Sequence, residues 1–185
     1  MKDPSDDWTL LKRACDDDGA LQTLFHRHKR YVFRLAWGLL NEDAAAEDVV
    51  QDVFTRVREN RFKNAKPQAK FRSWLYQVAI NTAREHARKR RRIWGGQGAG
   101  DDLTQLPDHS ADPELRDALK DMHRALQHLP LRQREVVLLR YYEGFDTAET
   151  AAIVGCRSGT VKAHLNRATQ ALRQYLGQHP TQEPD

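Results

Sequence analysis

The chain of 185 residues contains little cysteine and no long apolar run. Its two cysteines, Cys15 and Cys156, lie far apart and form no CxxC pair, which fits a protein of a reducing compartment. No apolar stretch approaches the ~20 residues of a transmembrane helix, and the first residues, MKDPSDDW, lack the basic start and apolar middle of a signal peptide. We therefore expect a protein without membrane insertion that stays in the cytoplasm.

Sequence features of enzymes are also missing. No glycine-rich phosphate loop follows a strand, because no segment shows the alternating pattern of a strand. His26 and His28 are two residues apart, which points them to different faces of a helix, and no further Cys or His completes a metal site. We interpret both as surface residues among basic neighbours. The sequence predicts no enzymatic activity, no cofactor and no metal site.

Helical periodicity dominates the first half of the chain. Apolar residues recur at helical spacing from Leu21 to Leu39, Asn41 is predicted to cap a second helix, and a third helix begins near Phe71 and runs into a basic segment. Trp74 lies on the apolar stripe of the third helix, which favours a core position over a stacking role. The predicted core stripe of the second helix consists of Ala46, Val49, Val50, Val53, Phe54 and Val57.

A glycine-rich and then acidic stretch interrupts this pattern. Residues 95–100 read GGQGAG, and an acidic segment with prolines follows up to Pro113, a composition typical of a linker. We therefore predict an all-α protein with two helical domains joined by a flexible linker. The predicted boundaries are a first domain at 1–94, the linker at 95–113, a second domain at 114–177 and a tail at 178–185.

The second domain shows the spacing of a helix-turn-helix. Ala151 and Gly155 lie four residues apart and Val161 follows six later. Ala151 is small enough for two helices to cross closely, and Gly155 can adopt the positive φ of a tight turn. Ser158 is predicted to be an N-cap whose hydroxyl accepts from the amide of Thr160 or Val161.

The helix after this turn has an outer face that suits DNA. Its apolar stripe consists of Val161, Leu165, Ala168 and Leu172, while the other side is small, polar and basic, which fits a major groove. The alternative is a solvated helix of an ordinary bundle. Likewise, the basic run at residues 88–92 is either a phosphate contact or a solvated helix end. The DNA-contact candidates on this helix are Arg157, Ser158, Gly159, Thr160, Lys162, His164 and Arg167.

Three segments in order resemble the extracytoplasmic-function sigma factors of bacterial RNA polymerase. They are AEDVVQDVF at residues 46–54, FRSWLYQVAIN at 71–81, and the stretch from Leu129 to Gly144 before the helix-turn-helix. The resemblance covers most of the chain. It implies that the first domain binds core polymerase and recognises and melts the minus-ten element, and that the second recognises the minus-thirty-five element. The implied function is promoter-specific transcription initiation.

Acidic residues of the second helix are the candidates for polymerase binding. Glu47, Asp48, Gln51 and Asp52 lie away from the apolar stripe and form a patch that suits a basic partner. The resemblance implies that this partner is the coiled-coil clamp of the β′ subunit, with the β flap as a second contact of core polymerase. The alternative is that these acids serve helix solubility and the helix dipole.

Candidates for the minus-ten element surround the third helix. Asn81 can donate and accept hydrogen bonds, so it can recognise a base edge, although it could instead cap a neighbouring backbone group. Lys66 belongs to a basic loop that could hold a nucleotide pulled from the stack. Arg84, Arg88 and Lys89 follow at helical spacing and are predicted to contact phosphates of duplex or single-stranded promoter DNA.

Departures from the family pattern concern DNA specificity. Ala163, His164 and Thr169 stand where members often carry other residues, so recognition of guanine by arginine is predicted to be reduced. The resemblance also implies an anti-sigma factor as a partner. Two other functions stay open from the residues alone. One is a stand-alone regulator that binds operator DNA as a dimer, and the other is a decoy that occupies polymerase without recognising promoters.

Overall fold

The computed structural model describes residues 6–59, 70–93 and 123–178. The chain divides into two compact units, Met1–Gln97 and Gly98–Asp185. Within the described residues all regular structure is helical, which confirms the all-α prediction. None of these helices is long and apolar enough to cross a membrane.

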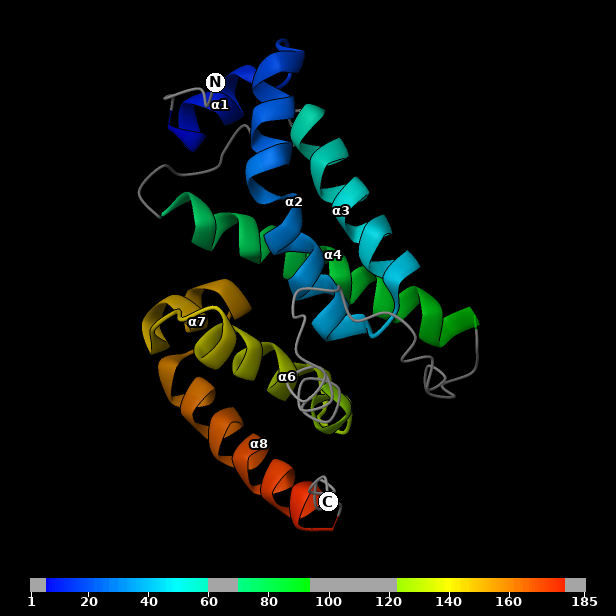
Figure 1. Cartoon of the computed structure of the whole chain (residues 1–185). Helices are drawn as coiled ribbons and strands as arrows, with labels where there is room; N and C mark the ends of the chain where they lie inside the picture. The colour runs from blue at the N-terminus through cyan, green and yellow to red at the C-terminus, as the bar shows by residue number, and fades with distance from the viewer. Residues whose placement is uncertain (1–5, 60–69, 94–122, 179–185) are drawn as a thin grey trace, which may run out of the picture. The chain divides into compact units, whose positions relative to one another are not determined.

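The described residues of the first unit form a bundle of four helices. They are α1 (Asp7–Arg13), α2 (Asp18–Leu40), α3 (Asp43–Arg58) and α4 (Phe71–Ile93). Helices α2 and α3 lie side by side, α4 packs across both, and α1 packs against α2 (Figure 1). Asp6 and Asp17 cap the first two helices, because their carboxylates accept the amides of Trp8 and Ala20 at 2.9 and 3.1 Å.

Asn41 ends α2 rather than starting α3. Its backbone is left-handed, with φ 55° and ψ 42°, and its N–H donates to the carbonyl of Trp37 at 2.8 Å. Glu42 occupies the N-cap position of α3. The prediction for Asn41 is therefore wrong. The physical reason is that asparagine also tolerates the left-handed conformation that terminates a helix, so its type marks a boundary without giving the direction.

The core of the first unit follows the predicted spacing. The predicted apolar stripe of α3 is buried throughout. It packs with buried side chains of α2 and α4, among them Leu24, Val32, Leu35, Leu39, Leu75, Val78 and Ala79. Trp74 is only partly buried, because it belongs to an aromatic cluster at the start of α4. Its ring centre lies 5.3 Å from that of Phe71 and 5.4 Å from that of Trp8.

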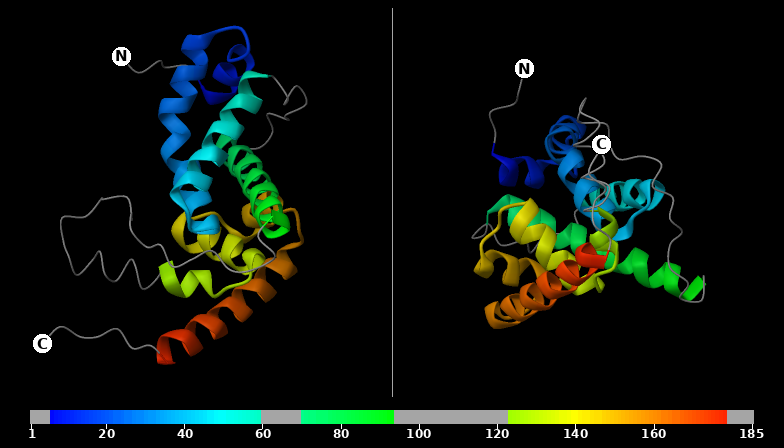
Figure 2. Two further views of the ribbon diagram at one scale, coloured as in Figure 1. Left: turned by 90° about the vertical axis from the view of Figure 1, so that its right-hand side faces the viewer. Right: turned by 60° about the horizontal axis from the view of Figure 1, so that its bottom comes forward.

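The second unit is built around one long helix. Residues 123–127 are helical, followed by α6 (Leu131–Val137), the π-helical segment η1 (Leu138–Tyr142), α7 (Thr147–Val154) and α8 (Ser158–Gln178). Both α6 and α7 pack on α8 (Figure 2). A reciprocal cap starts α7, since Asp146 accepts the amide of Glu149 at 2.7 Å and donates its own to the Glu149 carboxylate at 3.0 Å.

A buried arginine holds the interior of the second unit together. Arg134 donates to the backbone carbonyls of Leu126, Gln127 and Leu129 at 3.0, 2.8 and 3.1 Å. Burial lowers the pKa of Arg134 to about 10, so the side chain stays charged at neutral pH. Burial, with the nearby Arg134 charge, lowers the pKa of His123 to about 4. This histidine is therefore neutral in the folded protein at neutral pH.

Candidate nucleic-acid and polymerase interface

The turn of the helix-turn-helix has the predicted geometry. Gly155 ends α7 with φ 78° and ψ 48°, the left-handed conformation that favours glycine. The amides of Gly155 and Cys156 both donate to the carbonyl of Ala151 at 2.9 Å. Ala151 is buried where α7 packs on α8. The predictions for Ala151 and Gly155 are confirmed.

The start of α8 differs from the prediction by one residue. The helix begins at Ser158 itself, and the amides of Thr160 and Val161 donate to the carbonyl of Arg157 at 2.9 and 3.2 Å. Arg157 therefore occupies the N-cap position, and the N-cap prediction for Ser158 is wrong. The residue that supplies the first helical carbonyl lies directly after the turn, whatever its side chain offers.

The two sides of α8 separate apolar from basic residues. Val161 and Ala168 are fully buried, and Leu165 and Leu172 are partly buried. His164 is half-buried, and its Nδ1 is enclosed without a hydrogen-bond partner among the described residues. No Asp or Glu occurs from Ser158 to Gln178, so the exposed side is free of acidic residues. The exposed residues of α8 and its N-cap include Arg157, Ser158, Gly159, Thr160, Lys162, Ala163, Asn166 and Arg167.

One side of α4 exposes the residues predicted for the minus-ten element. Asn81, Arg88 and Lys89 are exposed. Arg84 is partly buried, and its Nη1 donates to Oδ1 of Asn81 at 3.0 Å. This contact orients the Asn81 amide and brings the two predicted residues together. Lys66 lies outside the described residues.

Helix α4 is also tied to α3 by polar contacts that the sequence did not predict. Arg56 of α3 donates to Oγ1 of Thr82 at 3.0 Å and to the Glu85 carboxylate at 2.6 Å. Thr82 is fully buried, and its hydroxyl donates a hydrogen bond to the carbonyl of Val78 at 3.0 Å. Arg56 thus satisfies a buried hydroxyl and an acid on the neighbouring helix.

Two further pairs extend this contact along α4. Nε2 of His86 lies 2.8 Å from Oδ2 of Asp52, and Arg90 forms an ion pair with Glu42. We call the contacts made by Glu42, Asp52 and Arg56 with α4 the α3–α4 seam. Asp52, a predicted polymerase contact, therefore contacts His86 within its own unit. Arg90 is the residue of the basic run whose charge is paired with an acid, Glu42.

The rest of the basic run stays on the surface. Arg88, Lys89, Arg91 and Arg92, with Glu85, line a shallow cavity of about 460 Å³ at the end of α4. All four basic residues are exposed. Of the five cations of the basic run at residues 88–92, Arg90 is therefore paired with Glu42, and the other four can contact an anionic ligand.

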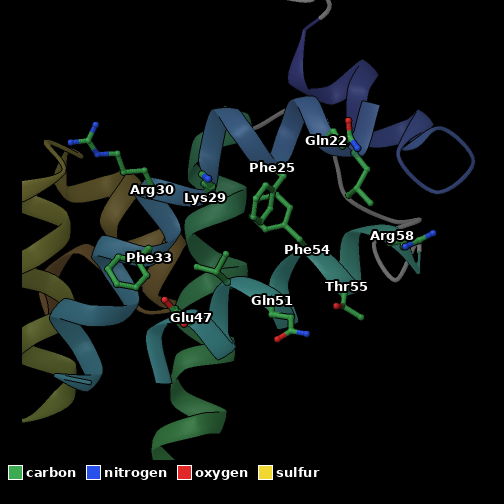
Figure 3. A pocket seen from close by; sticks show the side chains of 12 residues that line it. Gln22, Phe25, Lys29, Arg30, Phe33, Glu47, Gln51, Phe54, Thr55 and Arg58 are labelled. Carbon is green, nitrogen blue, oxygen red and sulfur yellow. The ribbon is translucent and has the colours of Figure 1, made fainter. Parts of the chain in front are cut away.

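An apolar groove of about 750 Å³ lies on the surface where α2 packs beside α3 (Figure 3). Its floor includes Phe25 and Phe54, whose rings meet edge to face with centres 5.0 Å apart. Lys29 and Arg30 of α2 and Arg58 of α3 line its basic margin. Phe25 is one of the apolar residues that recur at helical spacing from Leu21 to Leu39, but the structure leaves it partly exposed in this groove. An apolar groove with charged margins suits a protein partner.

Acidic residues of α3 border the same groove. Glu47 and Gln51 line it, and Asp48 is exposed beside them. Three of the four predicted polymerase contacts therefore share one surface, whereas Asp52 faces α4 through His86. We call the groove together with Glu47, Asp48 and Gln51 the docking face.

His28 is not a surface residue, contrary to the prediction. Its Nε2 lies 2.8 Å from Oδ2 of Asp7, while Arg27 donates to the other Asp7 oxygen at 2.6 Å. Burial lowers the pKa of His28, an effect that Asp7 opposes. His26 is exposed as predicted. Within the described ranges, no group of three or more His, Cys, Asp or Glu could hold a metal ion.

Comparison with known proteins places both units in one family. Residues 24–93 match Sigma-70 region 2, and residues 119–172 match Sigma-70 region 4. The chain is 31% identical over 189 residues to the ECF RNA polymerase sigma factor SigE of Mycolicibacterium smegmatis, covering 97% of this chain and 72% of that protein. It is 33% identical over 162 residues to the RNA polymerase sigma factor CarQ of Myxococcus xanthus, covering 86% and 90%.

Solved structures share the fold. The sigma factor RpoE of Bartonella quintana, in complex with the anti-sigma factor NepR, superposes with a TM-score of 0.70 at 24% identity, covering 84% of this chain and 96% of that one. CnrH in complex with the cytosolic domain of CnrY gives a TM-score of 0.67 at 23% identity, covering 94% and 98%.

Proposed function

Because this chain belongs to the sigma-70 family, in its extracytoplasmic-function group, we propose that its docking face binds core RNA polymerase and that α4 and α8 recognise two promoter elements. The chain is an RNA polymerase sigma factor and not an enzyme. No finding favours the stand-alone regulator or the decoy. The observation that carries the residue-level proposal is the exposure of one basic, acid-free helix face in the second unit and one basic face of α4 in the first.

Core polymerase is the proposed partner of the docking face. Glu47, Asp48 and Gln51 offer acceptors beside an apolar groove, which complements a partner with basic and apolar side chains. We assign this partner to the clamp of the β′ subunit and propose that the second unit contacts the β flap. Asp52 contributes indirectly, because its contact with His86 holds α3 against α4.

An anti-sigma factor is the proposed competitor for the same face. The solved relatives RpoE and CnrH are described in complex with NepR and with the cytosolic domain of CnrY. An apolar groove that two partners need can be occupied by only one of them. We propose that an anti-sigma factor keeps this chain inactive by covering the docking face.

The exposed face of α4 is proposed to bind the minus-ten element. Asn81, oriented by Arg84, offers an amide that recognises a base edge of the opened strand. Arg88 and Lys89 supply charge for phosphates nearby. Lys66 is proposed to contribute from the loop before α4. This face combines one base-specific group with several phosphate contacts.

The exposed face of α8 is proposed to enter the major groove at the minus-thirty-five element. The residues near the start of a recognition helix contact base edges, and Arg157, Thr160 and Lys162 lie there. Ser158, Gly159, His164 and Arg167 complete the proposed surface. The proposed promoter-binding domains keep the predicted boundaries, with region 2 at 1–94, the linker at 95–113 and region 4 at 114–177.

Core binding by charge-reversed variants tests the docking proposal. Glu47→Lys with Asp48→Lys is expected to weaken affinity for core polymerase by at least about tenfold, because two attractive contacts become repulsive. Glu59→Lys, a single charge reversal at the C-cap of α3, is the control and should leave affinity within about twofold. Equal affinity for the double variant and the control would show that the docking face does not bind core polymerase.

A further inference from the structure

A tyrosine flanked by two arginines lies where α2 meets the first turn of α4. The guanidinium carbon of Arg34 lies 5.1 Å from the ring centre of Tyr31, and that of Arg72 lies 5.7 Å from it. Arg72 is also 5.3 Å from the ring centre of the buried Tyr76. Tyr31 is 41% exposed. We call Tyr31, Arg34 and Arg72 the Tyr31 cluster, which belongs to none of the surfaces described above.

Stacking on a ring prepares a guanidinium for a phosphate. The face of the guanidinium meets the aromatic ring, whereas its N–H donors lie at the edge of the plane and point toward other acceptors. A side chain held in this way also loses less rotamer entropy when it binds. Phosphate oxygens match the donor spacing of arginine. The Tyr31 cluster therefore suits a phosphate-containing ligand.

The neighbouring turn of α4 is fixed from two sides. Phe71, the residue before Arg72, lies 5.3 Å from Trp8 of α1 and 5.1 Å from His28 of α2, measured between ring centres. Asp7, beside Trp8, binds both Arg27 and His28. Helix α1 thus ties the first turn of α4 to α2, which keeps Arg72 beside Tyr31.

The surrounding sequence is basic and aromatic. Residues 26–34 read HRHKRYVFR, in which Arg27 is paired with Asp7 and Lys29 and Arg30 line the groove. Arg34 and Arg72 add two positive charges beside an exposed ring. Basic residues interleaved with aromatic ones are typical of surfaces that contact nucleic acid, and single strands in particular use them.

The Tyr31 cluster lies apart from the Asn81 face of α4. Arg72 and Asn81 are nine residues apart, which on a helix is roughly half a turn around the axis and about 14 Å along it. A strand that contacts Asn81 can therefore meet the Tyr31 cluster only with other nucleotides, after passing around the first turns of α4. A single strand can follow this path, whereas a stiff duplex cannot.

We propose that Arg34 and Arg72, held by Tyr31, bind phosphates of the displaced promoter strand at nucleotides other than those that contact Asn81. The inference rests on the proposed function of α4. It extends the single-strand contact surface from α4 to α2.

Salt dependence of strand binding tests this inference. The probe is a fluorescent oligonucleotide of the displaced strand, taken from a promoter whose start site this holoenzyme sets, and the protein is the full chain bound to core polymerase. The plot of log K against log salt has a negative slope, and each lost phosphate contact reduces its steepness by about 0.7 for a single strand. Arg34→Ala with Arg72→Ala should therefore reduce the steepness of this slope by about 1.4. Lys12→Ala, an exposed cation of α1, is the control and should leave it unchanged.

Conservative variants separate the cluster from general charge loss. Tyr31→Phe keeps the ring and should bind like the wild type, whereas Tyr31→Ala should weaken binding. Arg34→Lys with Arg72→Lys keeps the charge and should keep the slope while affinity falls, and this pair also serves if the alanine pair does not fold. A wild-type slope for the alanine pair, or a loss of core affinity in its place, would overturn the inference.

Two controls distinguish this failure from failure of the proposed function. If Arg88→Ala with Lys89→Ala lowers the slope while the alanine pair of the Tyr31 cluster does not, only the further inference fails. If the wild-type holoenzyme does not bind the strand, or if the Arg88 and Lys89 variant keeps the wild-type slope, the proposed role of α4 fails first.

Discussion

The two proposed DNA-binding helices are positioned by different means. Helix α4 packs through buried apolar residues such as Leu75 and Ile80. It also packs through polar pairs with α3, in which Arg56 binds Glu85 and Asp52 binds His86. Helix α8 is held by apolar burial, with Val161 and Ala168 fully enclosed, and it contains no acidic residue. In α4 the same polar chemistry serves both packing and DNA contact, whereas in α8 the two tasks fall on separate faces.

This difference predicts different sensitivities. Substitutions on the buried side of α8 should destabilise the second unit, while substitutions on the exposed side should weaken DNA binding without changing stability. Changes to the polar pairs between α3 and α4 should cost less stability, because these pairs are partly exposed and screened.

A charge at the buried face of α8 should have the largest effect. Val161→Asp places a carboxylate at a fully buried position and should destabilise the second unit by about 3 to 5 kcal/mol. The measurement is urea unfolding followed by circular dichroism and by fluorescence. All four tryptophans, at positions 8, 37, 74 and 94, lie before residue 98, so fluorescence should keep its wild-type midpoint while the circular dichroism transition shifts.

Gln170→Asp is the matched control for this variant, because it adds the same charge at an exposed position of α8. It should unfold like the wild type. An equal shift for both variants would mean that charge on α8, and not burial, determines its stability.

Acid should destabilise the second unit through His123. The folded-state pKa of about 4 lies below the ordinary value of 6.5, so the unfolded chain takes up the proton first as pH falls. Stability should therefore decline by about 3 kcal/mol between roughly pH 6.5 and 4. His123→Gln should remove this decline, as measured by urea unfolding followed by circular dichroism at each pH. His128→Gln, at an exposed position, should retain it.

Removing cations from the exposed face of α8 should weaken duplex binding without unfolding. Lys162→Ala with Arg167→Ala should reduce the steepness of the negative slope of log K against log salt by about 1.8 on duplex promoter DNA, since each phosphate contact contributes about 0.9. Arg173→Ala removes an exposed cation near the other end of α8 and should leave the slope unchanged. Equal slopes for all variants would exclude this face from DNA contact.

The smallest effect is expected at the α3–α4 seam. Arg56→Met removes the contacts to Thr82 and Glu85 and should cost about 1 to 2 kcal/mol, measured by urea unfolding followed by tryptophan fluorescence. Arg58→Met removes a more exposed arginine of the same helix, paired with Asp18 at 3.5 Å, and should cost less than about 0.5 kcal/mol. Equal costs would show that the seam contributes no more than an ordinary surface pair.

Much of this architecture could be predicted from the sequence because it depends on local patterns. The apolar spacing of α3 predicted its buried face, and Gly155 predicted the turn before α8. The reciprocal cap of α7 also has a local signal in the sequence, the D-x-x-E spacing of Asp146 and Glu149.

The pairs that connect helices could not be predicted in this way. Asp52 meets His86 across 34 residues, and Asp7 meets His28 across 21. Periodicity gives the side of a helix on which a residue lies, but not which helix faces it. For this reason the contact between Asp52 and His86 was not predicted, and His28 was wrongly predicted to be exposed. Asn41 and Ser158 failed for a different reason, since residue type alone marks a helix boundary without fixing its direction or register.

Start-site mapping with purified core polymerase tests the central claim most directly. Transcription on sheared genomic DNA, with and without this protein, should yield new start sites that share two upstream elements at a constant separation. Asn81→Ala should then reduce initiation at these sites, and Lys162→Ala should do the same through the other element. The account would be contradicted if the chain failed to join core polymerase yet protected duplex DNA by itself.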